Sequence, residues 1–174
     1  MKINKCYWFW GLSGSGKTTL GNLLKIWLLQ FNEKVILLDG DEIRLGLNKN
    51  LGFSLEDRIE NVRRVAELSK IFLNEGYDVV VSMITPLKVM HELNENILNE
   101  AYVDIFVNTP LSVCRERDTK GLYLLALNKK IKNVSGIDSP FEIKTFPSIE
   151  VATEKMTIKH TFDLVVEKIR LIRK

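Results

Sequence analysis

The sequence predicts an α/β fold, a three-layer sandwich in which a parallel sheet is flanked by helices, with a mobile lid. Two observations predict the layers. Short apolar segments alternate along the chain with longer segments whose apolar residues recur every three or four positions. A glycine-rich stretch, Gly-Leu-Ser-Gly-Ser-Gly-Lys-Thr at residues 11–18, joins the first apolar segment to the first helical one. Strands that alternate with helices form a parallel sheet through right-handed crossovers.

The glycine-rich stretch matches the phosphate-binding pattern G-x-x-x-x-G-K-[ST], so the sandwich is expected to be of the P-loop NTPase type. Glycines at this turn permit a positive φ and let the backbone approach phosphates closely. Lys17 is expected to reach the β- and γ-phosphates of a nucleoside triphosphate, and the hydroxyl of Thr18 to bind Mg²⁺. The residues expected to hold the nucleotide are Gly11, Ser13, Gly14, Ser15, Gly16, Lys17, Thr18 and Thr19.

Short apolar segments predict the strands. They are Cys6–Trp10, Val35–Asp39, Asp78–Ser82 and residues 103–107. The segment Val35–Asp39 is almost wholly apolar and ends in a carboxylate, which is typical of a parallel strand buried on both faces.

Helical periodicity predicts the crossovers. The predicted helices cover residues 17 to about 30, residues 56–74, a part of residues 87–99, and a C-terminal segment marked by Ile158, Phe162, Val165, Ile169 and Ile172. Ser54 is a suitable N-cap for the second of these helices, and Gly76 lies just past its end.

Residues 118–147 interrupt this alternation with lysines, glycines and prolines and little sustained periodicity. We call this stretch the lid segment, because the composition fits a mobile lid. An ordinary solvated surface loop is the alternative. With the lid segment included, residues 1–174 are expected to form a single domain.

Composition narrows the class of protein. The net charge of +3 suits small anionic substrates but lacks the clustered excess of a protein that binds nucleic-acid polymers. Two cysteines make no disulfide framework and have no metal-ligand spacing. No charged leader with an apolar region and no apolar run of membrane-spanning length is present, which predicts a cytoplasmic protein without membrane contact.

Two carboxylates end the second predicted strand, where open α/β sheets bind ligands. Asp41 is expected to orient the attacking hydroxyl and accept its proton, and Arg44 to hold an anion on the acceptor. Asp39 is expected to share the metal with Thr18. Asp41, Lys17 and Arg44 are thus the predicted catalytic residues. Alternatively, Asp39 and Asp41 could only end the strand and cap the next helix.

A dense charged segment follows at residues 53–64. Arg58 and Asn61 lie three residues apart on one helical face, so both could point at one acidic ligand. Phe53 could stack on a base. A solvated helix would show a similar density of charge, so the segment alone leaves both readings open.

Together these motifs resemble one family. They are Trp8-Phe9, the glycine-rich stretch, Leu38-Asp39-Gly40-Asp41 with Arg44, Gly52-Phe53-Ser54 with Asp57-Arg58 and Glu60-Asn61-Val62-Arg63, Asn108-Thr109-Pro110-Leu111, Cys114, Arg117-Asp118, Lys120-Gly121-Leu122-Tyr123, and Ser135-Gly136-Ile137-Asp138-Ser139-Pro140. This ordered set resembles the adenylylsulfate kinases of sulfate assimilation.

The resemblance implies transfer of the γ-phosphoryl group of ATP to the 3′-hydroxyl of a nucleotide with an anionic substituent, with Mg²⁺ as cofactor and a homodimer as the assembly. It implies an acceptor site lined by Asp41, Arg44, Phe53, Arg58, Asn61, Ile84, Thr85, Lys120 and Val134. Arg117 would lie beside the ATP base.

Departures from the family pattern fall around the acceptor. The family holds adenine between two aromatic rings, but here Phe53 is kept and the second position is Val134. Ile84-Thr85-Pro86-Leu87-Lys88 replaces the usual Ile-Ser-Pro-aromatic-Arg, and Trp10 replaces a small polar residue. Losing one stacking ring weakens base binding by about 1–3 kcal/mol.

Other functions remain open at this point. A smaller pyrimidine needs less stacking area, so cytidine diphosphoramidate, the acceptor of family members in bacterial capsule pathways, is the alternative substrate. A regulatory P-loop hydrolase would use water as its acceptor, and a silent nucleotide-binding module would transfer nothing.

Overall fold

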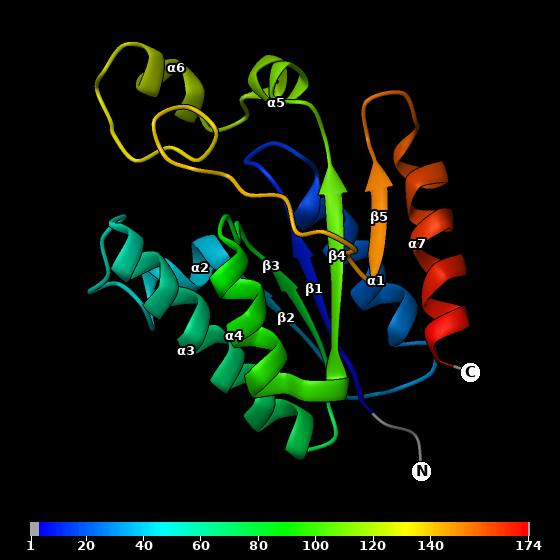
Figure 1. Ribbon diagram of the computed structural model, residues 1–174. Helices are drawn as coiled ribbons and strands as arrows, with labels where there is room; N and C mark the ends of the chain where they lie inside the picture. The colour runs from blue at the N-terminus through cyan, green and yellow to red at the C-terminus, as the bar shows by residue number, and fades with distance from the viewer. Residues whose placement is uncertain (1–3, 174) are drawn as a thin grey trace.

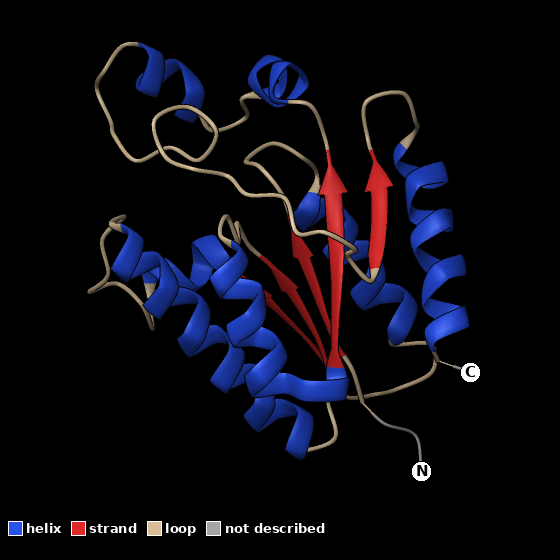
Figure 2. Cartoon of the chain, in the orientation of Figure 1, coloured by secondary structure: helices blue, strands red, loops and turns tan. Residues whose placement is uncertain are grey.

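The computed structural model describes residues 4–173, whose strands form one parallel sheet with helices on both faces (Figures 1 and 2). The strands are β1 (Cys6–Trp10), β2 (Val35–Asp39), β3 (Asp78–Ser82), β4 (Tyr102–Asn108) and β5 (Ile149–Ala152). Their order across the sheet is β2-β3-β1-β4-β5, and each neighbouring pair is parallel. The predicted α/β sandwich is confirmed.

The helices are α1 (Lys17–Leu28), α2 (Gly40–Leu45), α3 (Leu55–Asn74), α4 (Lys88–Leu98), the 3₁₀ helix η1 (Asn99–Ala101), α5 (Leu111–Arg117), α6 (Leu122–Leu127) and α7 (Ile158–Ile172). Figure 1 shows α3 and α4 on one face of the sheet and α1 and α7 on the other. Every strand and helix that the sequence predicted is present, and the predicted and observed bounds differ by at most two residues.

Both faces of β1 are buried. Cys6, Trp8 and Trp10 pack toward α3 and α4, whereas Tyr7 and Phe9 pack toward α1 and α7, and all are fully inaccessible to solvent. Successive side chains of a strand point to opposite faces, so a strand covered by helices on both sides needs apolar residues at every position. The core therefore holds β1 at the centre of the sheet and fixes the loop that follows it.

Helix caps define where the site-bearing helices begin. The Ser54 hydroxyl accepts a hydrogen bond from the Asp57 amide at 3.1 Å, which confirms it as the N-cap of α3. Asp39 caps α2, because one carboxylate oxygen accepts the Asp41 amide at 2.9 Å. Gly76, with φ of 84°, follows α3.

The lid segment is partly helical. It contains α6, and Figure 1 shows it crossing the carboxyl ends of the central strands beside α5. The two oxygens of Asp118 accept the amides of Tyr123 at 3.1 Å and Leu124 at 3.0 Å, which starts α6. Over residues 4–173, no helix combines the length and apolarity needed to cross a membrane.

Candidate active site

The glycine-rich loop lies between β1 and α1 and depends on its glycines. Gly11 has φ of 149°, and a Cβ there would stand 2.7 Å from the Val107 carbonyl oxygen. Gly14 has φ of 74°, and its Cβ would stand 3.0 Å from the Cys114 carbonyl oxygen. Larger residues would strain the backbone and collide with β4 or α5, so the loop keeps its phosphate-binding conformation only with glycine.

Lys17 is folded onto this loop. Its side chain is 8% exposed, and Nζ donates a hydrogen bond to the Leu12 carbonyl at 2.7 Å. Burial lowers the pKa of Lys17 from 10.5 to about 8. The ammonium group therefore stands where phosphates would be cradled and titrates nearer to neutral pH than an exposed lysine.

A group of oxygen donors lies beside Lys17. The Thr18 hydroxyl donates to Oδ2 of Asp39 at 2.8 Å and lies 3.1 Å from the Ser82 hydroxyl. Asp39 and Ser82 are register partners at the ends of β2 and β3. Hard oxygen ligands of this kind suit Mg²⁺. Among residues 4–173 no group of three or more His, Cys, Asp or Glu side chains is arranged to hold a metal ion.

Asp39 caps α2 through one carboxylate oxygen, which was one of the two roles that the sequence left open, and its other oxygen accepts the Thr18 hydroxyl. Metal binding by Asp39 and Thr18 stays a prediction. Ser82 was not predicted as a site residue, although its place at the end of a strand next to β2 is a usable signal.

Asp41 lies at the start of α2 with 68% of its side chain exposed. Lys120 of the lid segment donates a hydrogen bond from Nζ to Oδ2 of Asp41. The predicted base and a predicted lid cation thus meet directly. The pair is solvent-exposed, so its contribution to stability is small and the contact can break when a substrate arrives.

Phe53 and two arginines form the rest of this side of the site. Phe53 is 56% exposed, and the guanidinium carbon of Arg44 lies 4.5 Å from its ring centroid. Arg44 also donates to the Gly52 carbonyl at 2.9 Å. An exposed ring with a cation on it is suited to an anionic nucleotide.

Arg58 connects this ring to the lid segment. Its Nε donates to the Phe53 carbonyl at 3.1 Å, and NH1 donates to the Ser135 hydroxyl at 2.9 Å. NH2 donates to the Asn133 carbonyl. Burial lowers the pKa of Arg58. The guanidinium therefore joins the start of α3 to the lid segment.

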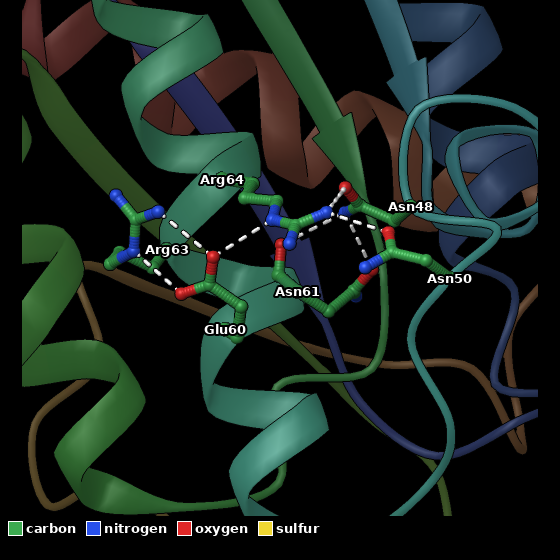
Figure 3. A network of polar contacts seen from close by, with 6 residues as sticks. All are labelled: Asn48, Asn50, Glu60, Asn61, Arg63 and Arg64. Atoms are coloured by element: carbon green, nitrogen blue, oxygen red, sulfur yellow. Dashed lines mark hydrogen bonds and ion pairs between the residues drawn. The ribbon is translucent and has the colours of Figure 1, made fainter.

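Asn61 lies one turn along α3 from Arg58 and is buried. It belongs to a polar network with Asn48, Asn50, Glu60, Arg63 and Arg64, drawn in Figure 3. The structure thus places Arg58 and Asn61 on the inner face of α3, whereas 44% of the Arg63 side chain is exposed.

Arg117 donates hydrogen bonds to the glycine-rich loop and to Thr153. NH1 donates to the Gly14 carbonyl at 3.2 Å and to the Thr153 hydroxyl at 2.9 Å, and NH2 donates to the Thr153 carbonyl at 2.8 Å. The Tyr123 hydroxyl donates to the Ser13 carbonyl at 2.9 Å. Contact of Arg117 with the ATP base stays a prediction. Neither Thr153 nor Tyr123 was predicted as a site residue, although Tyr123 belongs to a motif of the family resemblance. Thr153 follows β5 and Tyr123 lies in α6, and the sequence predicted neither element.

Other predicted acceptor residues have mixed placements. Ile84 is half-buried just past β3. Thr85 is fully buried and its hydroxyl accepts the Trp8 indole N–H at 2.8 Å, so it packs in the core and does not line the acceptor side as predicted. Val134 is 5% exposed and packs in a small cluster with Leu12, Cys114 and Tyr123.

The prediction that Trp10 belongs to the surroundings of the acceptor is wrong, because Trp10 is completely buried and its ring stacks on Phe106 with centroids 4.1 Å apart. Its indole N–H donates to Asp104 at 3.2 Å. Trp10 therefore belongs to the core beneath the loop and does not line the acceptor side.

Residues 4–152 match the family model described as adenylylsulphate kinase. The chain belongs to this family. It is 42% identical over 160 residues to the adenylyl-sulfate kinase of Clostridium kluyveri, covering 92% of this chain and 80% of that one. It is 44% identical over 163 residues to the adenylyl-sulfate kinase of Pseudomonas aeruginosa, with coverage of 93% and 81%.

Among solved structures, the APS kinase CysC of Mycobacterium tuberculosis in complex with AMPPNP and APS superimposes with a TM-score of 0.91. The identity is 35%, and 98% of this chain and 99% of that chain are covered. Family membership makes this chain a phosphotransferase of the nucleotide 3′-kinase class that uses ATP.

Proposed function

We propose that the chain transfers the γ-phosphoryl group of ATP to the 3′-hydroxyl of adenylyl sulfate, giving 3′-phosphoadenylyl sulfate and ADP. One observation supports this most strongly. The exposed ring of Phe53 contacts Arg44 of α2, and Asp41 lies in the first turn of the same helix. Asp39, the N-cap of α2, accepts a hydrogen bond from Thr18 of the glycine-rich motif. An anionic nucleotide on Phe53 would thus face the phosphate-binding loop.

The reaction follows from these positions. The bond from the acceptor's 3′-oxygen to the γ-phosphorus forms as the bond to the β–γ bridging oxygen breaks, and ADP leaves with that electron pair. Asp41 accepts the hydroxyl proton, since its exposed carboxylate is available once Lys120 moves away. Lys17 stabilises the negative charge on the transferring group, and Arg44 and Arg58 hold the anion of the acceptor. Mg²⁺ bound near Thr18 and Asp39 would neutralise phosphate charge.

The lid segment serves as the mobile closing element in this proposal. Lys120 and the backbone held by Arg58 both belong to it, so its position is linked to Asp41 and to Phe53. Closure would exclude water from the phosphoryl group and limit hydrolysis of ATP.

Cytidine diphosphoramidate is the second candidate acceptor, favoured by Val134. Because Val134 replaces the second stacking ring and is buried in its own cluster, Phe53 is left as the aromatic contact for the base. A pyrimidine loses less from one-sided stacking than adenine does. Family membership favours adenylyl sulfate.

The assembly and location belong to the same proposal. We infer a homodimer in the cytoplasm from the family resemblance, and sedimentation of the purified chain tests the dimer.

The deciding experiment measures ADP release from Mg·ATP with adenylyl sulfate, with cytidine diphosphoramidate, or with no acceptor. The proposal expects the highest kcat/KM with adenylyl sulfate. A higher kcat/KM with cytidine diphosphoramidate would instead assign the enzyme to a capsule pathway. ADP release at the same rate without acceptor would identify a hydrolase.

A further inference from the structure

A buried pair of amides joins the two elements that carry the acceptor residues. Asn48 is fully buried in the loop between α2 and α3, and Asn61 of α3 is 4% exposed. Nδ2 of Asn48 donates to Oδ1 of Asn61 at 2.9 Å. A buried amide without its partner is costly, so this bond is strongly favoured over an unpaired arrangement.

The direction of both amides is fixed by Arg64. Its NH1 lies 3.5 Å from Oδ1 of Asn48 and 2.9 Å from Oδ1 of Asn50 (Figure 3). A guanidinium only donates hydrogen bonds, so the oxygen of Asn48 must face it and the NH₂ group of Asn48 must face Asn61. Asn61 consequently accepts through its oxygen.

The outer end of the network is held by a carboxylate. Glu60 accepts Nε of Arg64 at 2.8 Å and Nε of Arg63 at 2.7 Å. These arginines lower the pKa of Glu60 to about 2, so it stays ionised at neutral pH. Arg64 is thereby kept in place beside Asn48.

The side-chain NH₂ group of Asn61 is available to donate a hydrogen bond to a ligand. Among residues 4–173 no hydrogen bond of the structure uses this group, whereas the oxygen is taken by Asn48. An NH₂ group attracts the oxygens of an anionic acceptor, and a carbonyl oxygen in the same place would repel them.

Asn48 also sets the spacing of the two helices. Its backbone amide donates to the Ile43 carbonyl of α2 at 2.9 Å, while its side chain reaches α3. Asp41 and Arg44 lie on α2, and Arg58 and Asn61 lie on α3. One residue therefore links both halves of the acceptor side.

We propose that Asn48 is a positioning residue for acceptor binding: it holds the NH₂ group of Asn61 toward the acceptor and fixes α2 against α3. This inference rests on the proposed kinase function. Asn48 itself needs no contact with the substrate.

Two substitutions separate this role from simple packing. Asn48→Ala removes the hydrogen bond, and the KM for the acceptor should rise about 10-fold while the KM for ATP changes less than about twofold. Asn48→Asp keeps the volume but cannot donate to Asn61, so the Asn61 amide should turn its oxygen toward the acceptor. The acceptor KM should then rise more than in Asn48→Ala.

Asn50→Ala is the matched control, because Asn50 is an exposed asparagine of the same loop that contacts Arg64 and not Asn61. It should change the acceptor KM by less than about twofold. Three results would each overturn the inference. The acceptor KM could rise less in Asn48→Asp than in Asn48→Ala, the KM for ATP could rise as much as the acceptor KM in Asn48→Ala, or Asn50→Ala could raise the acceptor KM as much as Asn48→Ala does.

A double-mutant cycle covers the case in which Asn48→Asp does not fold. With Asn61→Ala as background, adding Asn48→Ala should raise the acceptor KM by less than about twofold, because the positioned group is already gone. A further rise of about 10-fold would refute the positioning role. The wild-type enzyme is assayed first with each acceptor, and lack of activity with adenylyl sulfate at this step would count against the proposed substrate only. The variants are then compared with the acceptor that the wild-type enzyme prefers.

Discussion

Asp41 is the residue on which the proposed chemistry depends most. Asp41→Asn keeps the size of the side chain but removes its proton-accepting charge, so kcat should fall about 10²- to 10⁴-fold. The KM for ATP should stay nearly constant, because Asp39 and Lys17 are untouched. Steady-state kinetics with both substrates measure the effect. Glu42→Gln, a neighbouring exposed acid on α2, is the control, and equal activity of both variants would exclude Asp41 from the mechanism.

Lys17 predicts a pH dependence. Its pKa in the free protein is lowered to about 8 by burial, so the cation is lost as pH rises through that value. The kcat/KM for Mg·ATP, which reports on the free enzyme, should therefore fall above about pH 8. In Lys17→Arg, the activity that remains should show no such fall above pH 8, because arginine stays charged. A flat wild-type profile up to pH 10 would contradict the assignment.

At the residue scale, the glycine-rich loop lies between β1 and α1 as its motif predicted, whereas two residues that were assigned to the acceptor side lie in the core. Lys17 and Thr18 follow from a motif in which each position has a mechanical task. Thr85 and Trp10 could not be placed correctly, because local sequence does not reveal whether a side chain at a strand end turns into the core or toward the acceptor side. The sequence around Asn48 did not indicate a role for this residue, because that role depends on its contact with α3, which follows later in the chain.

At the scale of elements, the segment that returns from the lid to β5 is anchored on one buried carboxylate. Asp104 of β4 accepts Lys144 Nζ at 3.0 Å, the Ser148 amide at 3.0 Å and the Ser148 hydroxyl at 2.7 Å. Lys144 also contacts Glu95 of α4 at 2.7 Å. Burial opposes ionisation, but the bonds from Ser148 and the charge of Lys144 leave the pKa of Asp104 lowered. The far end of the lid is thus tied to the sheet.

This anchor predicts a large loss of stability. The side chain of Asp104 is fully buried, so Asp104→Ala leaves Lys144 without its buried partner and should lower the free energy of unfolding by about 3–5 kcal/mol. Urea denaturation measures the change. Asp163→Ala breaks an exposed pair with Lys159 and should cost less than about 0.5 kcal/mol. Similar losses in both variants would refute the anchor.

The elements absent from the sequence prediction share a physical cause. In α6 almost every residue is apolar, so no helical period separates an inner from an outer face. Strand β5 has four residues, with buried Ile149 and Val151 alternating with outward-facing positions, which is too short a pattern to stand out. α2 is a single short helix started by the Asp39 cap. Longer elements, such as α3 and α7, were predicted because their periods extend over several turns.

At the scale of the whole molecule, buried polar groups make stability depend on pH. His91 is 1% exposed, and burial lowers its pKa from 6.5 to about 4. The unfolded chain therefore binds a proton that the folded protein excludes, and stability falls as pH drops from 6.5 toward 4. The loss should be on the order of 3 kcal/mol at the acid end.

Denaturation of the wild type and His91→Gln at several pH values tests this. Other acids contribute equally to both proteins, so the difference in unfolding free energy between them should change by roughly 3 kcal/mol between pH 7 and pH 4. A difference that stays constant over this range would show that His91 does not titrate as its burial requires.

Transfer of a phosphoryl group to the 3′-hydroxyl of adenylyl sulfate is tested most directly by identifying the product. Phosphorus NMR of a reaction containing the enzyme, Mg·ATP and adenylyl sulfate should show 3′-phosphoadenylyl sulfate in equal amount to ADP. Inorganic phosphate formed with ADP while adenylyl sulfate remains unchanged would show hydrolysis of ATP and contradict this transfer.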